Sequence, residues 1–132
     1  MVMTMERVAH HGRETAYCVA DRGGSGTALC CVHGSGGTHE VWKAQLSRLA
    51  AERPVVALDL SGHGDSEDVA TPPGPETMAA YADDLVAVLR VTDAGAVCGN
   101  SLGGAVALTA VLDRDIDPMA LDIEGPNVLV VR

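Results

Sequence analysis

A serine between two glycines is the sharpest chemical signal in this sequence. Residues 99–103 read GNSLG and fit the pattern G-x-S-x-G. That pattern is typical of a sharp turn from a strand into a helix, which presents the serine hydroxyl in a cleft above the positive end of the helix. Glycine at positions 99 and 103 allows the strand and the helix to approach closely. We therefore predict that Ser101 is a nucleophile, with a simple glycine-rich turn as the alternative.

A second glycine-rich segment, HGSGG at residues 33–37, directly follows an expected buried strand. A loop built from such small residues exposes backbone N–H groups. The amide of Ser35 can pair with the amide of Leu102 to bind an oxyanion. A flexible glycine turn is the alternative. We interpret His33 as a brace for this loop, because a tight turn after a strand leaves its side chain little freedom.

A third segment, DLSGHGDS at residues 59–66, follows the next expected strand. Glycines on both sides of His63 predict a tight loop, and the side chains of Asp65 and Ser66 can bond nearby backbone N–H groups. We interpret this loop as structural. A catalytic base at His63 is the alternative.

The elements that must position these segments alternate along the chain. We expect strands at 6–10, 15–21, 28–32, 54–58, 94–98 and 119–123, and helices at 40–51, 76–91 and 105–112. A hairpin turn at residues 11–12 joins the first two strands, and Thr38 caps the first helix. The alternation favours an α/β fold: a mostly parallel sheet of about six strands with helices on both faces. Residues 1–132 are interpreted as one domain.

The composition excludes several classes of partner. The 132 residues include 18 acidic and 9 basic side chains, and the net charge of −9 repels phosphate backbones. There is no Phe, one Trp and two Tyr, so a stacking surface for single strands is not expected. No segment approaches the roughly 18 apolar residues of a membrane span. We therefore expect neither nucleic acid nor a membrane as a partner.

Cysteine usage predicts a cytoplasmic protein. No two of the four cysteines have the C-x-x-C spacing, so no metal site is expected, and they are interpreted as small buried side chains. Cys30 and Cys31 are neighbours and would face opposite sides of a strand. The acidic excess and the single lysine, Lys43, are interpreted as the mark of a salt-adapted organism.

The three segments, in this order and on these elements, resemble the α/β-hydrolase superfamily, and within it the esterase, epoxide-hydrolase and haloperoxidase types. The resemblance covers roughly residues 6–123, the N-terminal half of such an enzyme. It implies Ser101 as nucleophile and the amides of Ser35 and Leu102 as the oxyanion hole. It also implies an acyl-enzyme formed from a small-molecule ester or related acyl substrate, with no cofactor and no metal.

The remainder of a catalytic triad is not evident. The family places its histidine after the nucleophile, whereas all five histidines precede Ser101: His10, His11, His33, His39 and His63. Asp122 or Glu124 follows the last expected strand, and Glu124 is the weak candidate for the acid, with a solvated loop carboxylate as the alternative. The cap and the last strands of the family would also be missing. We therefore expect little activity from this chain alone.

Two other functions stay open. One is a non-catalytic half-domain that assembles with itself or a partner through an exposed sheet edge, which the apolar segment 127–132 would otherwise cover. The other is a nucleotide-binding domain, in which residues 34–36 follow a strand and Asp59 ends the next one. Against that second alternative, His39 stands where the third glycine of the fingerprint should be.

Overall fold

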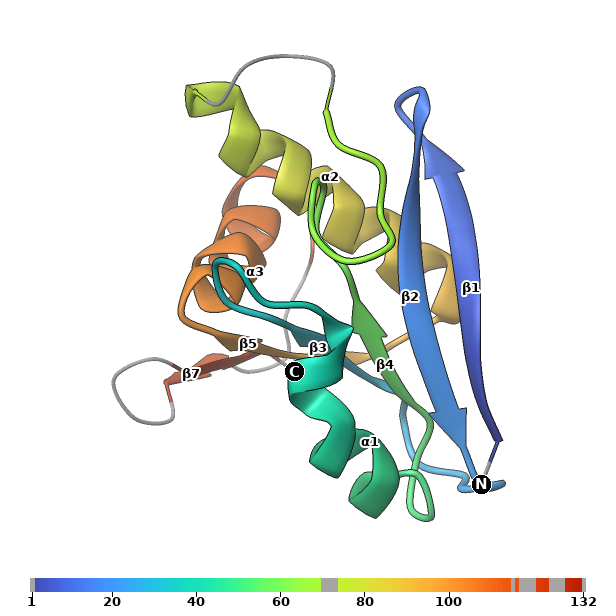
Figure 1. Cartoon of the computed structure of the whole chain (residues 1–132). Helices are drawn as coiled ribbons and strands as arrows, with labels where there is room; N and C mark the ends of the chain where they lie inside the picture. Colours follow the sequence, from blue (N-terminus) through green and yellow to red (C-terminus); the bar gives the residue numbers. More distant parts are fainter. Residues whose placement is uncertain (1, 70–73, 115, 117–120, 124–127, 132) are drawn as a thin grey trace.

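A computed structural model of the chain describes residues 2–69, 74–114, 116, 121–123 and 128–131. These residues form one seven-stranded sheet in the order β1-β2-β4-β3-β5-β7-β6, with helices on either side (Figure 1). The strands are β1 (Val2–His10), β2 (Arg13–Asp21), β3 (Leu29–Val32), β4 (Val55–Leu58), β5 (Ala96–Asn100), β6 (Leu121–Ile123) and β7 (Val128–Val131).

The sheet is mixed, so the prediction of a mostly parallel sheet is wrong. Parallel pairing among the described strands is confined to β3, which lies between β4 and β5. The pairs β1–β2, β2–β4, β5–β7 and β6–β7 are antiparallel. Short connections explain the two outer pairs, because a two-residue hairpin or a four-residue link cannot complete the crossover that parallel strands require. The parallel centre still brings the carboxyl ends of β3 and β5 side by side.

The helices begin near their predicted positions. A 3-10 turn η1 (His39–Trp42) leads into α1 (Lys43–Leu49), and the Thr38 hydroxyl caps it by accepting from the amide of Glu40 at 3.2 Å. The other two helices are α2 (Pro75–Thr92) and α3 (Leu102–Asp113). None of the helices in the described part of the chain combines the length and apolar character that crossing a bilayer requires.

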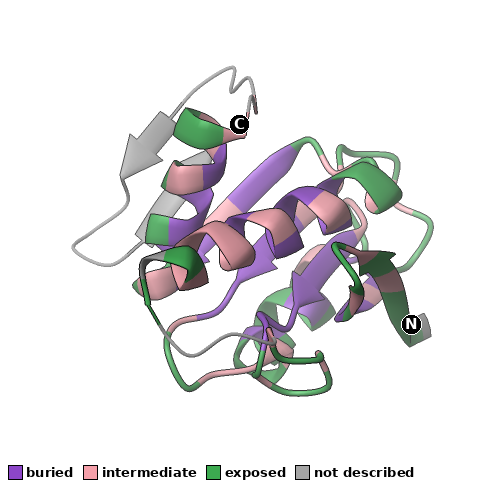
Figure 2. Ribbon diagram, turned by 90° about the horizontal axis from the view of Figure 1, so that it is seen from above, coloured by how far each residue is buried: buried purple, intermediate pink, exposed green. Residues whose placement is uncertain are grey.

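Helices cover both faces of the sheet, as predicted. Alternate side chains of each central strand belong to different cores: Cys30 and Val32 pack with α2 and α3, whereas Cys31 packs with α1. Figure 1 shows α1 on one side of the sheet and α2 with α3 on the other, and in Figure 2 the buried residues concentrate in the sheet and on the inner sides of the helices. Burial raises the pKa of Cys31 to about 12, with a smaller contribution from the neighbouring Cys98 thiol, so Cys31 is an inert thiol at neutral pH.

A buried carboxylate ties the N-terminal hairpin to α2. Asp84 of α2 is fully buried and accepts hydrogen bonds from the Arg13 guanidinium at 3.0 Å and the Thr15 hydroxyl at 3.1 Å. The amide of Ser61, at 2.9 Å, and its hydroxyl, at 2.7 Å, donate to the other carboxylate oxygen. Asp84 thereby joins β2, α2 and the loop after β4, and its charge is matched by that of Arg13.

Candidate active site

Ser101 occupies the strained turn that the sequence predicts. It lies between β5 and α3 with φ 56° and ψ −115°, a conformation that costs a non-glycine residue about 1–3 kcal/mol. Its side chain is exposed, and its hydroxyl makes no capping hydrogen bond to α3. The turn therefore presents a free hydroxyl at the carboxyl edge of the central strands, at the amino end of a twelve-residue helix.

The two flanking glycines allow close packing of backbone on backbone. A Cβ on Gly99 would overlap the carbonyl group of Gly103, and a Cβ on Gly103 would overlap the carbonyl oxygen of Val32 in β3. No flexible side chain is present at either place to move aside. This confirms why the pattern requires glycine at both positions: strand, turn and helix meet there without room for a methyl group.

The loop that follows β3 reaches the same point. A Cβ on Gly34 would lie 3.3 Å from the Asn100 carbonyl oxygen and 3.6 Å from the Cβ of Ser101. The amide of Gly37 donates to the carbonyl of Gly34 at 3.0 Å, and Gly36 has φ 74°. That combination is a type II turn with Ser35 at its second position.

The amides of Ser35 and Leu102 are the ones that the sequence assigns to an oxyanion hole. No described residue accepts a hydrogen bond from either amide. Ser35 is exposed, and Leu102 is the first residue of α3. Both amides are thus available on segments that lie against Ser101.

His33 is a structural brace. Its ring is fully buried, Nδ1 donates to the Gly34 carbonyl at 2.7 Å, and Nε2 accepts from the amide of Leu60 at 3.1 Å. These partners fix one neutral tautomer. Burial lowers the pKa of His33, which outweighs the opposing effect of the Gly34 hydrogen bond. The ring connects the loops after β3 and β4 and has no nitrogen free to act as a base.

His63 braces the same two loops from the other side. Its Nδ1 lies 3.0 Å from the Ser61 carbonyl, and its Nε2 accepts from the amide of Gly36 at 3.3 Å. Its ring centre lies 4.9 Å from that of His33. Both ring nitrogens of His63 are therefore used by the backbone, which supports the structural interpretation of the loop and disfavours a catalytic base here.

Sequence reasoning missed the pairing of His39 with Asp59. The fully buried Asp59 carboxylate accepts from the His39 amide at 2.7 Å, from its ring Nδ1 at 2.9 Å and from the amide of Asp65 at 3.0 Å. Ser66 bonds the backbone as expected, accepting from the amide of Ala16 at 2.8 Å. No periodicity or spacing pairs residues 39 and 59, because the contact forms only when β3 and β4 lie side by side.

This pairing affects two predictions. The carboxylate of Asp59 is occupied within the protein and cannot bind a ribose, so the nucleotide-binding alternative fails at the acidic residue on which it depends. His39, Asp59 and Asp65 also offer donor atoms within 4.8 Å of one another, the arrangement of a metal site. Both oxygens of Asp59 already accept hydrogen bonds, and we therefore interpret the cluster as a third brace between the two loops.

The weak candidate for the acid, Glu124, lies outside the described residues. Asp122 lies in β6, which pairs with β7. The histidines at positions 10 and 11 lie at the β1–β2 hairpin, where Nε2 of His10 is 3.2 Å from the Asp84 carboxylate and Nε2 of His11 is 3.8 Å from that of Asp83. Among the described residues, the structure thus brings together Ser101 and the segments that carry the two predicted oxyanion amides, together with the three braces.

Comparisons with known proteins agree with this geometry. Residues 31–131 match the model of the alpha/beta hydrolase family. An uncharacterized protein of Mycobacterium tuberculosis is 38% identical over 100 residues, which cover 74% of this chain and 28% of that protein. The soluble epoxide hydrolase of a Corynebacterium species is 37% identical over 94 residues, covering 70% of this chain and 32% of the enzyme.

Solved structures share the fold. The crystal structure of a hydrolase from Pseudomonas aeruginosa superposes with a TM-score of 0.70 at 30% identity, and the match covers 84% of this chain and 42% of that one. The chain therefore spans less than half the length of these relatives. The turn at Ser101, the loops against it and the family match together establish that this chain belongs to the alpha/beta hydrolase family.

Proposed function

We propose that this chain provides the nucleophile and the oxyanion-binding amides of a serine hydrolase that acts on an ester or a related acyl substrate. The observation that carries the proposal is Ser101 itself. Its exposed hydroxyl stands on a strained turn, and the Gly34 backbone lies against its Cβ. The fold maintains this arrangement against local strain, which is the behaviour expected of a preorganised site.

The proposed chemistry follows from that geometry. The Oγ of Ser101 attacks the acyl carbonyl carbon and transfers its proton to a base, and the carbonyl oxygen becomes an oxyanion between the amides of Ser35 and Leu102. Collapse of this intermediate expels the alcohol and leaves an acyl-serine. Water then attacks the acyl-serine to release the acid and regenerate the hydroxyl.

The base is the part that the described residues do not provide. No histidine among the described residues hydrogen-bonds the Ser101 hydroxyl: the ring nitrogens of His33 and His63 are all engaged elsewhere, and His39 bonds Asp59 through Nδ1. A serine hydroxyl without a base is a weak nucleophile. We therefore propose that the 132-residue chain alone reacts slowly, and that a histidine and an acid from outside the described residues complete the site in a competent enzyme.

Epoxide opening is the second candidate, because one relative is a soluble epoxide hydrolase. A carboxylate nucleophile would favour that reaction, whereas this chain has a serine at position 101. The residue type therefore favours acyl transfer. A non-catalytic half-domain remains the outcome to be tested against both.

The decisive experiment is chemical rescue of the missing base. The chain is incubated with a fluorophosphonate probe at neutral pH with and without added imidazole, and labelled peptides are quantified by mass spectrometry. We expect Ser101 to be the preferred site, with labelling accelerated by imidazole and abolished in Ser101→Ala. Ser47→Ala, which changes an exposed serine on α1, is the matched control and should leave the labelling unchanged.

The oxyanion assignment is tested separately at position 35. Proline is favoured at the second position of a type II turn, so Ser35→Pro removes the amide hydrogen while the turn is kept. We expect Ser35→Pro to slow labelling of Ser101 by about 100-fold and Ser35→Ala to leave it unchanged. Labelling spread over other serines in the folded chain, even with imidazole, would contradict the proposal and favour a non-catalytic half-domain.

A further inference from the structure

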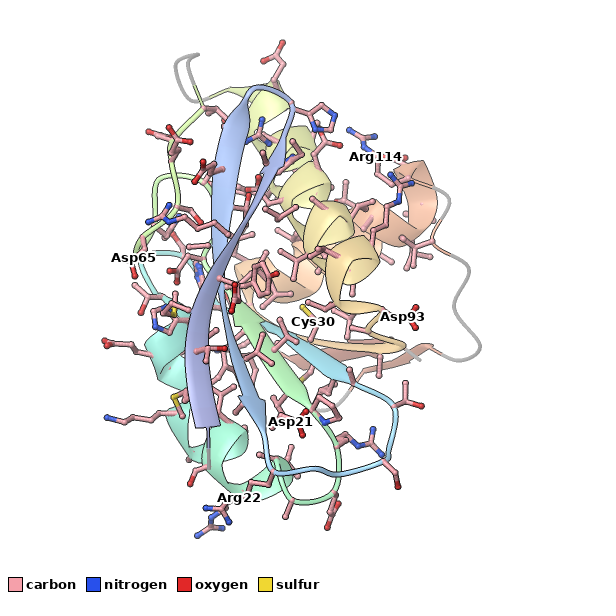
Figure 3. The ribbon with its side chains drawn as sticks, turned by 90° about the vertical axis from the view of Figure 1, so that its right-hand side faces the viewer. Asp21, Arg22, Cys30, Asp65, Asp93 and Arg114 are labelled. Carbon is pink, nitrogen blue, oxygen red and sulfur yellow. The ribbon has the colours of Figure 1, made fainter. Side chains whose placement is uncertain are left out.

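A cavity away from Ser101 lies beside the N-terminal hairpin. It has a volume of about 560 Å³ and is bounded by the end of β1, the outer side of α2 and the last turn of α3. Figure 3 shows Arg114 reaching from the end of α3 toward α2 and the hairpin tip. Among the described residues, neither the turn at Ser101 nor the loops after β3 and β4 line it. Its volume is within the usual range of small-molecule sites, about 300–1,000 Å³.

One part of the cavity wall is apolar. Val8 of β1 and Ala87 of α2 line it and are half-buried, whereas Val86 is only 6% exposed because it belongs to the core. Val91, at the end of α2, is 53% exposed although it is large and apolar. The exposed parts of Val8, Ala87 and Val91 offer a surface that an aliphatic chain would remove from water.

The charged lining residues are mostly basic. Arg114 Nε donates to the Asp83 carboxylate at 2.7 Å, and Nε2 of His11 lies 3.8 Å from the other oxygen of that carboxylate. The charge of Asp83 is thus matched, and the interaction raises the pKa of Arg114. Arg90 adds a second guanidinium, one that has no ion-pair partner among the described residues. Two arginines against one aspartate make this a basic region in a chain whose net charge is −9.

We propose that this cavity binds a carboxylate attached to a short aliphatic chain. The guanidinium of Arg90, an exposed residue that lines the cavity, can bond a planar carboxylate in a fork, and Val8, Ala87 and Val91 would cover the aliphatic part. An inorganic anion would leave the apolar surface unused, and an alcohol would leave Arg90 without a partner. The proposal rests on the cavity alone and does not depend on catalysis at Ser101.

The test is a titration of the intact chain with sodium octanoate, followed by backbone and histidine-ring resonances in NMR spectra. We expect saturable shifts confined to the amides around Val86 and Arg90 and to the ring of His11. Arg90→Gln keeps the length of the side chain and removes its charge, and we expect it to weaken binding about tenfold. Arg48→Gln, an exposed arginine on α1, is the matched control and should bind as the unmodified chain does.

Two further ligands separate the parts of the proposal. Octanol should bind more weakly than octanoate, and inorganic phosphate should not reproduce the shifts near Val86. Equal affinity for octanol and octanoate would overturn the anionic part, and equal shifts with phosphate would overturn the aliphatic part. The absence of saturable shifts with octanoate, or an unchanged affinity in Arg90→Gln, would overturn the proposal as a whole.

Discussion

Replacing Gly103 with alanine tests whether the fold around Ser101 depends on contact between backbones. A Cβ at position 103 would overlap the Val32 carbonyl oxygen and lie 2.8 Å from that of His33. Both groups belong to β3 and to the loop that follows it. The added methyl group can be accommodated only if α3 moves away from β3.

The expected change in the free energy of unfolding of Gly103→Ala follows from two opposing effects. Alanine is favoured over glycine inside a helix by about 1 kcal/mol. Overpacking in a core costs about 1–3 kcal/mol, and the upper value applies here because the obstacle is backbone rather than a flexible side chain. We therefore expect Gly103→Ala to lower the free energy of unfolding by about 2 kcal/mol, with slower labelling of Ser101.

Urea denaturation followed by the fluorescence of Trp42, the single tryptophan, measures this change. Gly36→Ala is the comparison variant: its φ is 74°, but no atom lies within 4 Å of the added Cβ. Only the backbone conformation is penalised there, at about 1–2 kcal/mol. If Gly103→Ala proved as stable as the unmodified chain, the close approach of α3 to β3 would be refuted as the reason for this glycine.

Three further measurements address the elements around the site. Thr38→Ala should lower the free energy of unfolding by about 1 kcal/mol through loss of the cap, with Thr38→Ser close to unchanged in the same urea titration. Burial lowers the pKa of His33 below its ordinary value of 6.5, so the unfolded chain takes up a proton that the folded chain excludes, and the urea midpoint should fall as the pH drops through 6.5. In His33→Gln the urea midpoint should fall less steeply with pH. An equally steep fall in this variant would contradict the assignment to His33. Asp84→Asn should lower the free energy of unfolding by about 3 kcal/mol, because it leaves the half-buried Arg13 charge without its fully buried counter-ion. Asp83→Asn, in a more exposed ion pair, should lower it by less than about 1 kcal/mol. Similar losses in both variants would refute the stabilising role of the Asp84–Arg13 pair.

Local sequence signals located most of the elements and the turn at Ser101. The turn at Ser101 is predictable because its requirement for small residues is local: residues 99–103 must bring a strand and a helix together within a few positions. Thr38 is predictable for the same reason, because its hydroxyl caps a helix that begins at the next residue. The alternation of Cys30 and Cys31 between the two faces follows from strand geometry alone.

The order and direction of the outer strands were not predictable in this way. A tail of consecutive apolar residues is compatible with a strand, but nothing within it says which neighbouring strand it joins. The structure places β7 between β5 and β6, antiparallel to both, and so makes the sheet mixed. Strand pairing joins segments that are distant in sequence, and the pattern of apolar side chains along one strand is compatible with several different neighbouring strands.

By itself, the sequence determined the class of fold, the strained turn at Ser101 and the two loops that flank it, because each depends on residues close together along the chain. Only the tertiary structure decided what those loops contact. The pairing of His39 with Asp59, the bond between His33 and Leu60 and the ion pair of Asp84 with Arg13 all join residues that are twenty or more positions apart. Such contacts arise from the packing of β3 against β4 and of α2 against the hairpin, and their energies depend on burial that no single segment possesses before folding.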